Sequence, residues 1–260
     1  LPLVIAATCM VLALPAASAA EAGFRQVTVT RAAGEKPAHF ALYYPTADVA
    51  RVIPMGPFPQ TVAINGAPAL AVKGLIVISH GTASTELGFA TLAQALARNG
   101  YLVASVEHVG DTWQDQSMRA TPGRYFAERP RQVSRVIDTV LADPLWSSRI
   151  GQGADGRPLI GAIGHSAGGY TVLALAGGRP VLSRLRAHCE TEAAQDPVLC
   201  TLSRGIGSAS AQAGGSADGQ EEPVQADPRV RAVMALAPMG VAFSPSSLAA
   251  ITVPVAIYAG

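Results

Sequence analysis

The chain has 260 residues, of which 49% are hydrophobic and 14% are charged. This length and composition suit one well-buried domain with an ample core. The formal net charge is +1 and no basic block occurs, which argues against nucleic acid as a main partner and gives no support for electrostatic binding to anionic membranes.

Residues 1–20 differ in kind from the rest of the chain. Residues 3–14 are almost wholly apolar, Pro15 ends the run, and Ala17-Ser18-Ala19 is a small-residue cleavage pattern. This pattern predicts a secretory signal peptide, cleaved after Ala19 or Ala20, and therefore a periplasmic or secreted protein. The run is too short for a spanning helix, which needs about 20 apolar residues, so no stable membrane span is expected after cleavage.

Cysteine usage fits an exported protein. Cleavage would remove Cys9 and leave Cys189 and Cys200. Two cysteines in an oxidising compartment favour a disulfide between them, the alternative being two unpaired thiols.

The first half of the chain is rich in predicted strands. Residues 24–30 alternate between apolar and polar side chains, and residues 75–79 form the continuous apolar run of a central parallel strand. Helical spacing over residues 87–98 stops at Asn99-Gly100. The elements expected here are strands at 24–30, 40–44, 61–64, 75–79 and 101–106, a helix at 87–98, irregular structure around 47–74 and a polar loop at 107–123.

The second half alternates strands with helices. The elements expected here are helices at 131–141, 169–175 and 182–192 and strands at 159–163, 230–236 and 253–258. Residues 205–227 are rich in Gly, Ser, Ala and Gln, which predicts a mobile loop. We expect residues 182–228 to form a lid-like insertion in a domain that spans residues 21–260. The alternation predicts an α/β fold with a mostly parallel central sheet flanked by helices, antiparallel where the first two strands follow each other without a helix.

A Gly-x-Ser-x-Gly motif lies between a predicted strand and a predicted helix. It reads Gly164-His165-Ser166-Ala167-Gly168. In a nucleophile elbow the turn from strand to helix is so tight that the glycine positions hold little more than a hydrogen, and the serine hydroxyl is exposed at a helix N-terminus. The alternative is a glycine-rich turn that happens to contain a serine. The strand and helix on either side favour an active-site serine at Ser166.

A second motif follows the strand at residues 75–79. It reads Ser79-His80-Gly81-Thr82. An acyl-transfer site needs two backbone N–H groups to bind the oxyanion, one from the residue after the nucleophile and one from the loop after this earlier strand. We therefore expect the N–H groups of Ala167 and Thr82 to form the oxyanion hole, with Gly81 allowing a close backbone approach; the alternative for Gly81 is an ordinary strand-to-loop glycine.

The histidines carry no clear general base. His80 and His165 adjoin the motifs, but a base must face the serine from across the site, so both are interpreted as structural, with His80 supporting the oxyanion loop. His108 either lines the pocket or is a solvated loop histidine, while His39 and His188 have no supporting pattern.

No cofactor and no metal are expected. The stretch Gly205-Ile206-Gly207 is not a dinucleotide fingerprint, because it lacks the third glycine and follows no strand.

These motifs resemble those of the α/β-hydrolase superfamily. The residues that carry the resemblance are the His80-Gly81-Thr82 loop, the motif from Gly164 to Tyr170 and the strand end Ala235-Leu236-Ala237-Pro238. More narrowly, the chain is similar to bacterial exported dienelactone-hydrolase-like proteins, relatives of platelet-activating-factor acetylhydrolases and polyester-cleaving cutinases. The resemblance implies serine esterase chemistry on a small-molecule or lipid-like ester, with Ser166 as nucleophile.

The chain departs from this superfamily in its triad. The order there is serine, acid, histidine, with the acid after the strand that here covers residues 253–258 and the histidine later still. After Ser166 the sequence offers only His188 and the aspartates Asp196, Asp218 and Asp227, none of which follows a suitable strand. We therefore expect the domain to be incomplete at Gly260, with the triad acid and histidine encoded further on.

Two other functions stay open. An enol-lactone hydrolase of the dienelactone type is one, although such enzymes commonly use cysteine where Ser166 stands. A non-catalytic binding protein on a hydrolase scaffold is the other.

Overall fold

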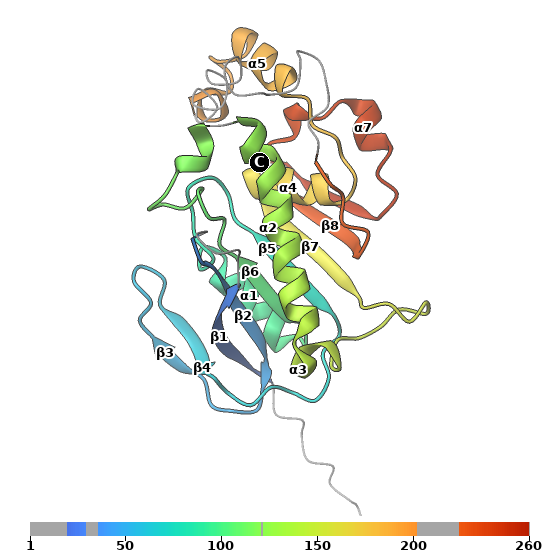
Figure 1. Cartoon of the computed structure of the whole chain (residues 1–260). Coiled ribbons are helices and arrows are strands. Elements are labelled where there is room, and N and C mark those ends of the chain that lie inside the picture. The colour runs from blue at the N-terminus through green and yellow to red at the C-terminus, as the bar shows by residue number, and fades with distance from the viewer. Residues whose placement is uncertain (1–19, 30–35, 121, 202–223, 260) are drawn as a thin grey trace, which may run out of the picture.

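The computed structural model describes residues 20–29, 36–120, 122–201 and 224–259. The strands of this part of the chain form one sheet in the order β3-β4-β1-β2-β6-β5-β7-β8-β9 (Figure 1). The strands are β1 (Glu21–Val29), β2 (Ala38–Thr46), β3 (Arg51–Ile53), β4 (Gln60–Ile64), β5 (Leu75–Ser79), β6 (Leu102–Val106), β7 (Ile160–His165), β8 (Val230–Leu236) and β9 (Val255–Tyr258).

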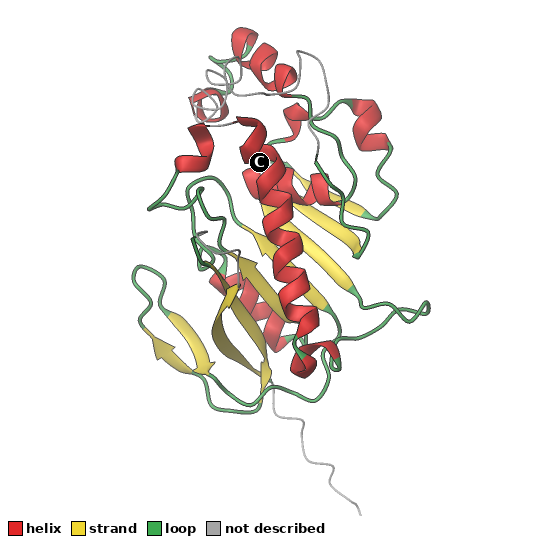
Figure 2. Cartoon of the chain, in the orientation of Figure 1, coloured by secondary structure: helices red, strands yellow, loops and turns green. Residues whose placement is uncertain are grey.

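Helices cover both faces of this sheet (Figure 2). They are α1 (Ala90–Arg98), α2 (Pro122–Ala142), α3 (Pro144–Ser147), α4 (Ala167–Leu175), α5 (Leu182–Thr191) and α7 (Pro245–Ala249), with short 3₁₀ turns at Ser117–Ala120 and Gly240–Ala242. No helix of the described residues is long and apolar enough to cross a membrane. The predicted signal peptide lies outside the described residues, apart from Ala20.

The direction of the strands follows the connections between them. β1 and β2 pair antiparallel, as expected, and β2 pairs antiparallel with β6. From β6 through β5, β7, β8 and β9 all pairs are parallel. The α/β fold with a mostly parallel sheet is therefore confirmed.

The segment at residues 47–74, expected to be largely irregular, contains two strands, β3 and β4, that extend the sheet. β3 and β4 form an antiparallel pair, and β4 pairs parallel with β1 through Gly23 and Phe24. β3 was not predicted, because Arg51 and Val52 are exposed and the strand has no apolar periodicity. β1 is consequently an interior strand, and β3 and β4 extend the sheet beyond it.

Alternation along the strands divides the interior into two cores. On β2, Phe40, Leu42 and Tyr44 belong to the larger core, which includes α2 and α4, while Ala41 and Tyr43 belong to the smaller one, which includes α1. Because successive side chains of a strand point to opposite faces, α1 covers one face of the sheet and α2 and α4 cover the other.

Helix α2 is longer than the sequence suggested. The sequence predicted a helix at residues 131–141, but the helix begins at Pro122 and contains Pro130. Proline has no N–H to donate to the carbonyl four residues earlier, that of Phe126. The hydroxyl of Tyr170 donates to this carbonyl at 3.0 Å. A residue of the motif after Ser166 thus supplies the hydrogen bond that Pro130 cannot.

The other end of the sheet is apolar and open. β9 pairs with β8 alone among the described strands, and Val255, Ile257 and Tyr258 are 39%, 53% and 58% exposed. Such an edge is an aggregation hazard unless it is covered.

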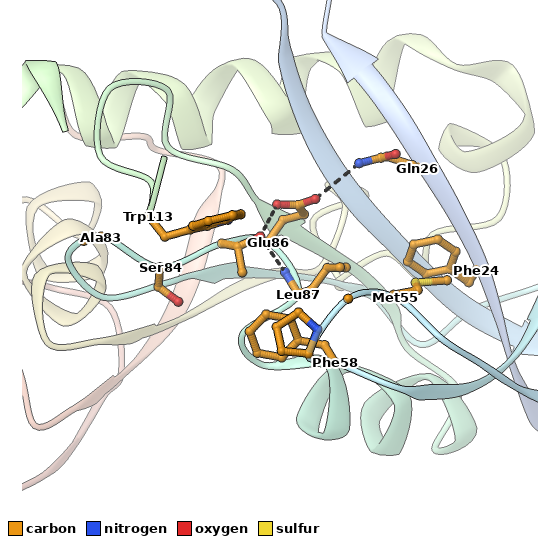
Figure 3. A pocket seen from close by; sticks show the side chains of 12 residues that line it. Phe24, Gln26, Met55, Phe58, Ala83, Ser84, Glu86, Leu87 and Trp113 are labelled. Atoms are coloured by element: carbon orange, nitrogen blue, oxygen red, sulfur yellow. Dashed lines mark hydrogen bonds between the residues drawn. The ribbon is translucent and has the colours of Figure 1, made fainter. Parts of the chain in front are cut away.

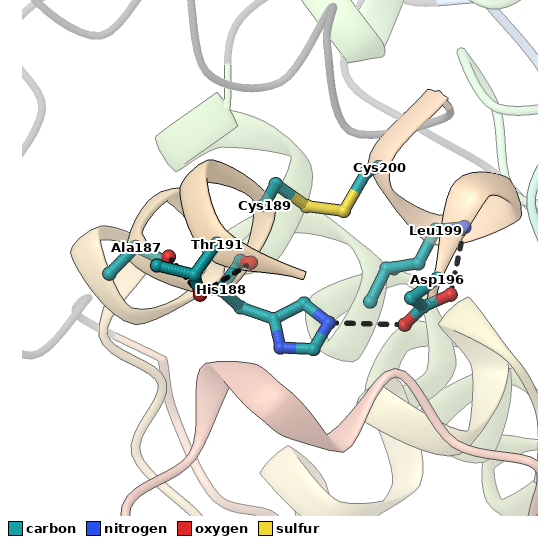
Figure 4. The surroundings of a disulfide bond; sticks show 7 residues. All are labelled: Ala187, His188, Cys189, Thr191, Asp196, Leu199 and Cys200. Atoms are coloured by element: carbon teal, nitrogen blue, oxygen red, sulfur yellow. Dashed lines mark hydrogen bonds and ion pairs between the residues drawn. A yellow bond between two sulfur atoms is a disulfide. The ribbon is translucent and has the colours of Figure 1, made fainter. Parts of the chain in front are cut away.

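The predicted lid-like segment is described in part. Helix α5 agrees closely with the predicted helix at 182–192, while most of the low-complexity stretch lies outside the described residues. Cys189 on α5 and Cys200 on the helical segment 197–201 form a disulfide (Figure 4). It closes a short loop and joins the two helical segments.

We expect the double variant Cys189→Ser/Cys200→Ser to lose stability in this region. By the loop-entropy model a closure of this length is worth about 3 kcal/mol, less any strain. Urea unfolding and limited proteolysis of residues 182–201 measure the loss. Reductant should shift the wild type to the same degree and leave the double variant unchanged. Two alkylatable thiols in the native exported protein would contradict the prediction.

Candidate active site

The two sequence motifs meet at the carboxyl ends of adjacent strands. β5 and β7 are parallel neighbours, and Ser79 at the end of β5 is in register with Gly164 on β7. The loop from His80 and the turn at Ser166 therefore leave the sheet side by side. Ligands of open α/β sheets bind in this position, outside the carboxyl ends of the strands.

The turn at Ser166 has the backbone geometry of a nucleophile elbow. Ser166 has φ 53° and ψ −114°, and α4 begins at the next residue. A Cβ on Gly164 would lie 2.0 Å from the carbonyl oxygen of Gly168, and a Cβ on Gly168 would lie 1.9 Å from that of Ser79. Both positions therefore exclude any side chain, which is the steric reason for glycine that the motif predicts.

The loop after β5 passes directly against the elbow. A Cβ on Gly81 would lie 3.5 Å from the Cβ of Ser166 and 3.1 Å from Nδ1 of His165. Thr82 follows, with its side-chain hydroxyl 3.1 Å from that of Tyr125. Within the described residues, neither the Thr82 N–H nor the Ala167 N–H donates a hydrogen bond, and the Ser166 hydroxyl has no partner. An acyl oxygen held between the two loops would find donors there.

A buried ion pair fixes this loop at both ends. Arg129 of α2 and Asp111 are fully buried and form a salt bridge. The Arg129 guanidinium also donates to the carbonyl oxygen of His80, and the other oxygen of Asp111 accepts from the N–H of Ala83 at 3.1 Å. Gly81 and Thr82 therefore lie on a short loop that is held on either side.

The same arginine reaches the elbow helix. Nε of Arg129 donates to Oγ1 of Thr171 on α4 at 3.1 Å, and its guanidinium lies over the ring of Tyr125. Sequence reasoning missed Arg129 and Asp111, because neither belongs to a motif and one of them lies in a helix whose start was placed too late. The sequence signals available were a charged residue, Arg129, just before the predicted helix at 131–141 and an aspartate, Asp111, in the polar loop at 107–123.

His80 and His108 form a second buried layer under the loop. Nδ1 of His80 donates to the carbonyl oxygen of Gly81 at 2.6 Å, and its Nε2 accepts from the N–H of His108. The ring nitrogens of His108 contact Oγ of Ser79 at 2.8 Å and Oε1 of Gln132 at 2.9 Å. All four ring nitrogens are thus occupied within the protein.

Both histidines are held neutral. Burial, followed by the positive charge of Arg129, lowers the pKa of His80 to about 3. The same two causes lower the pKa of His108 well below its ordinary value, with a further contribution from His80. A histidine that is fully buried and already bonded at both nitrogens is unsuited to accept a proton from Ser166. His108 is fully buried, so it is neither a solvated loop histidine nor a residue that lines an open pocket.

The other histidines lie elsewhere. His165 is exposed next to Ser166, with its ring 5.6 Å from that of Phe89. His39 contacts Thr28 at the start of β2. Nε2 of His188 on α5 lies within hydrogen-bond distance of Oδ2 of Asp196, at 3.2 Å, beside the disulfide (Figure 4).

The acids after Ser166 are also engaged. Asp227 accepts from Ser134 at 2.8 Å and pairs with Arg229, and Asp218 lies outside the described residues. In the described ranges no cluster of three or more His, Cys, Asp or Glu side chains could hold a metal ion.

We expect Gly168→Ala to damage the fold, because its Cβ would lie 1.9 Å from the backbone oxygen of Ser79 on β5, far inside van der Waals contact. Backbone cannot give way as a side-chain tip does, so the loss in the free energy of unfolding should be at least about 3 kcal/mol. Denaturant unfolding measures it. The matched control is Gly240→Ala, where a Cβ would meet nothing within 4 Å. Equal stability of the two variants would contradict the close packing described here.

We also expect the free energy of unfolding to decrease as pH is lowered below about 6.5, because of the two buried histidines. Their folded pKa values are lowered, so the unfolded state binds more protons below about pH 6.5, and the stabilisation present above that pH is lost as pH falls. Each histidine contributes a slope of at most about 1.4 kcal/mol per pH unit. Urea unfolding between pH 7.5 and pH 5 should show a smaller slope for His108→Gln than for the wild type or for His39→Gln. The same slope in all three proteins would refute the assignment.

Of the comparisons with known proteins, the one with solved structures agrees with the α/β architecture described above. No family model matches the chain, and no curated protein matches it. Among solved structures, the chain is similar to the ferulic acid esterase from Streptomyces cinnamoneus, with a TM-score of 0.57, 17% sequence identity, and coverage of 96% of this chain and 67% of that chain. At this identity the likeness shows the fold, which is of the α/β-hydrolase type.

Proposed function

We propose that this protein is an exported serine hydrolase that cleaves carboxylic esters through an acyl-enzyme on Ser166. The observation that carries the proposal is the positive φ of Ser166. This residue directly follows β7, lies between two glycine positions that admit no side chain, and is next to the Gly81-Thr82 loop at the end of β5. The esterase fold neighbour supports a hydrolase of this general class. Backbone strain of this kind persists only where the surroundings enforce it, and it concentrates at active sites.

In the proposed reaction Oγ of Ser166 attacks the ester carbonyl carbon, and its proton passes to a general base. The carbonyl oxygen becomes an oxyanion that accepts from the N–H groups of Thr82 and Ala167, at the N-terminus of α4. One such donor is typically worth about 3–4 kcal/mol of transition-state stabilisation. The base then returns the proton to the leaving alkoxide, and water hydrolyses the acyl-enzyme by the same steps.

The general base of this proposal is not assigned to a histidine of the described chain. His80 and His108 are buried and bonded at both nitrogens, and His165 adjoins the nucleophile.

Export and substrate class rest on other observations. The pattern of residues 1–20 supports a signal peptide, and the disulfide between Cys189 and Cys200 is compatible with an oxidising compartment. The apolar composition favours an ester with a hydrophobic part. An enol-lactone substrate or a purely binding role remain the alternatives, and the presence of serine at position 166 argues against the first.

We expect the protein to label with a fluorophosphonate at Ser166 and to hydrolyse a short-chain activated ester. Ser166→Ala should lose labelling and turnover with little change in stability, because removing one partly exposed oxygen leaves no large cavity.

Two outcomes would overturn parts of this proposal. Equal activity of Ser166→Ala and the wild type would remove Ser166 as nucleophile. Fluorophosphonate labelling of Ser166→Ala to the same degree as the wild type would show that the reactive serine lies elsewhere.

A further inference from the structure

A pocket of about 730 Å³ opens beside the Thr82 loop (Figure 3). Residues 83–87, which directly follow Thr82, form one wall, and the opposite wall comes from β1 and the loop at residues 55–58. Trp113 closes a third side. The acyl chemistry proposed above leaves this pocket without a role.

Aromatic and other apolar side chains form most of the pocket surface. Phe24, Phe58 and Trp113 present rings, and Met55 and Leu87 lie among them (Figure 3). Trp113 is 65% exposed, although its loop is tied to the pocket wall by a hydrogen bond from its N–H to the carbonyl oxygen of Ser84 at 3.1 Å. Such a surface binds apolar groups and, through the faces of its rings, organic cations.

The pocket also contains a carboxylate without a counter-ion, which favours an organic cation over an uncharged apolar group as the ligand. Glu86 lines the pocket and is only 7% exposed. Its oxygens accept from Nε2 of Gln26 at 3.2 Å and from the hydroxyl of Thr85 at 2.6 Å, both of which are uncharged. In the described part of the chain Glu86 has no ion-pair partner, and no lysine or arginine lines the pocket. Buried carboxylates are normally compensated by a cation.

A second carboxyl group, that of Glu107, lies behind this wall and is not among the residues that line the pocket. Glu107 accepts from the backbone N–H of His39 at 3.1 Å. Burial, followed by the negative charge of Glu86, raises the pKa of Glu107. A raised pKa makes Glu107 easier to protonate, so among the described residues that line the pocket the negative charge is that of Glu86.

We propose that this pocket recognises an organic cation with an apolar body, such as an alkylammonium or arylammonium group. The Glu86 carboxylate supplies the opposite charge, and the rings of Phe24, Phe58 and Trp113 supply apolar area and cation–π contacts. A neutral group would leave the carboxylate uncompensated, and an anion would be repelled. As a subsite of an ester substrate, which rests on the proposed function, the pocket would hold a cationic part of the ester beside the oxyanion loop.

Binding can be measured without catalysis. The chain has two tryptophans, and Trp146 is only 2% exposed, so a change in emission on adding ligand reports on Trp113. Three probes of similar size differ in charge: benzyltrimethylammonium, benzyl alcohol and benzenesulfonate. We expect the full chain to bind the cation at least tenfold more tightly than the alcohol, and not to bind the sulfonate.

Glu86→Gln keeps the side-chain shape and removes the charge. We expect it to bind the cation at least tenfold more weakly and the alcohol unchanged, while Glu190→Gln, the same change at an exposed position of α5, should match the wild type. Trp113→Ala, followed by calorimetry, is the second variant and should also weaken cation binding if Glu86→Gln does not fold. Equal affinity for cation and alcohol, no saturable binding, or the same loss in Glu190→Gln would each overturn the proposal.

The test separates this inference from the proposed ester chemistry. The binding experiment is repeated in Ser166→Ala, where the cation should bind as in the wild type. Cation binding without ester turnover by the full chain would sustain the pocket and overturn the proposed function. Ester turnover without cation binding would do the reverse.

Discussion

The candidate site depends on one buried ion pair. Arg129 and Asp111 are both fully excluded from solvent, and between them they bind the chain before Gly81 and after Thr82. A buried pair adds little net stability, but removing one partner typically costs about 3–5 kcal/mol, since the other charge is left uncompensated. The effect of the pair here is therefore to fix the backbone conformation of the loop. Other loop conformations would leave one of the two buried charges without its partner.

The ion pair also joins parts of the molecule that are distant in sequence. Arg129 belongs to α2, His80 follows β5, and Thr171 lies on α4. The Tyr170 hydroxyl bonds to the carbonyl that Pro130 leaves free in α2, which adds a second tie between the same two helices. Two features thus set the position of Ser166 relative to the Gly81-Thr82 loop: the register of β5 with β7 and the packing of α2 on α4.

Sequence patterns located the Ser166 motif and every strand except β3, but not the buried polar residues that support the loop. β5 and β8 agree with the predicted ranges because their apolar runs end at polar or turn residues, and the elbow was recognisable because its steric demands are met only by glycine. The polar layer under the loop was hidden. His80, His108, Asp111 and Arg129 become meaningful only when β5, β6 and α2 come together, and no local periodicity encodes that contact. The pocket was missed for the same reason, since Phe24, Phe58, Glu86 and Trp113 come from four separate segments.

The positive φ of Ser166 limits which amino acids the backbone can accommodate at position 166. At φ 53° a β-branched side chain is a conformational outlier, because its second branch crowds the backbone. Threonine carries the same hydroxyl and serves as a nucleophile in other proteins, yet this backbone disfavours it. Cysteine, unbranched like serine, fits without new strain. The mutational paths open to this position therefore exchange oxygen for sulfur more readily than they add a methyl group.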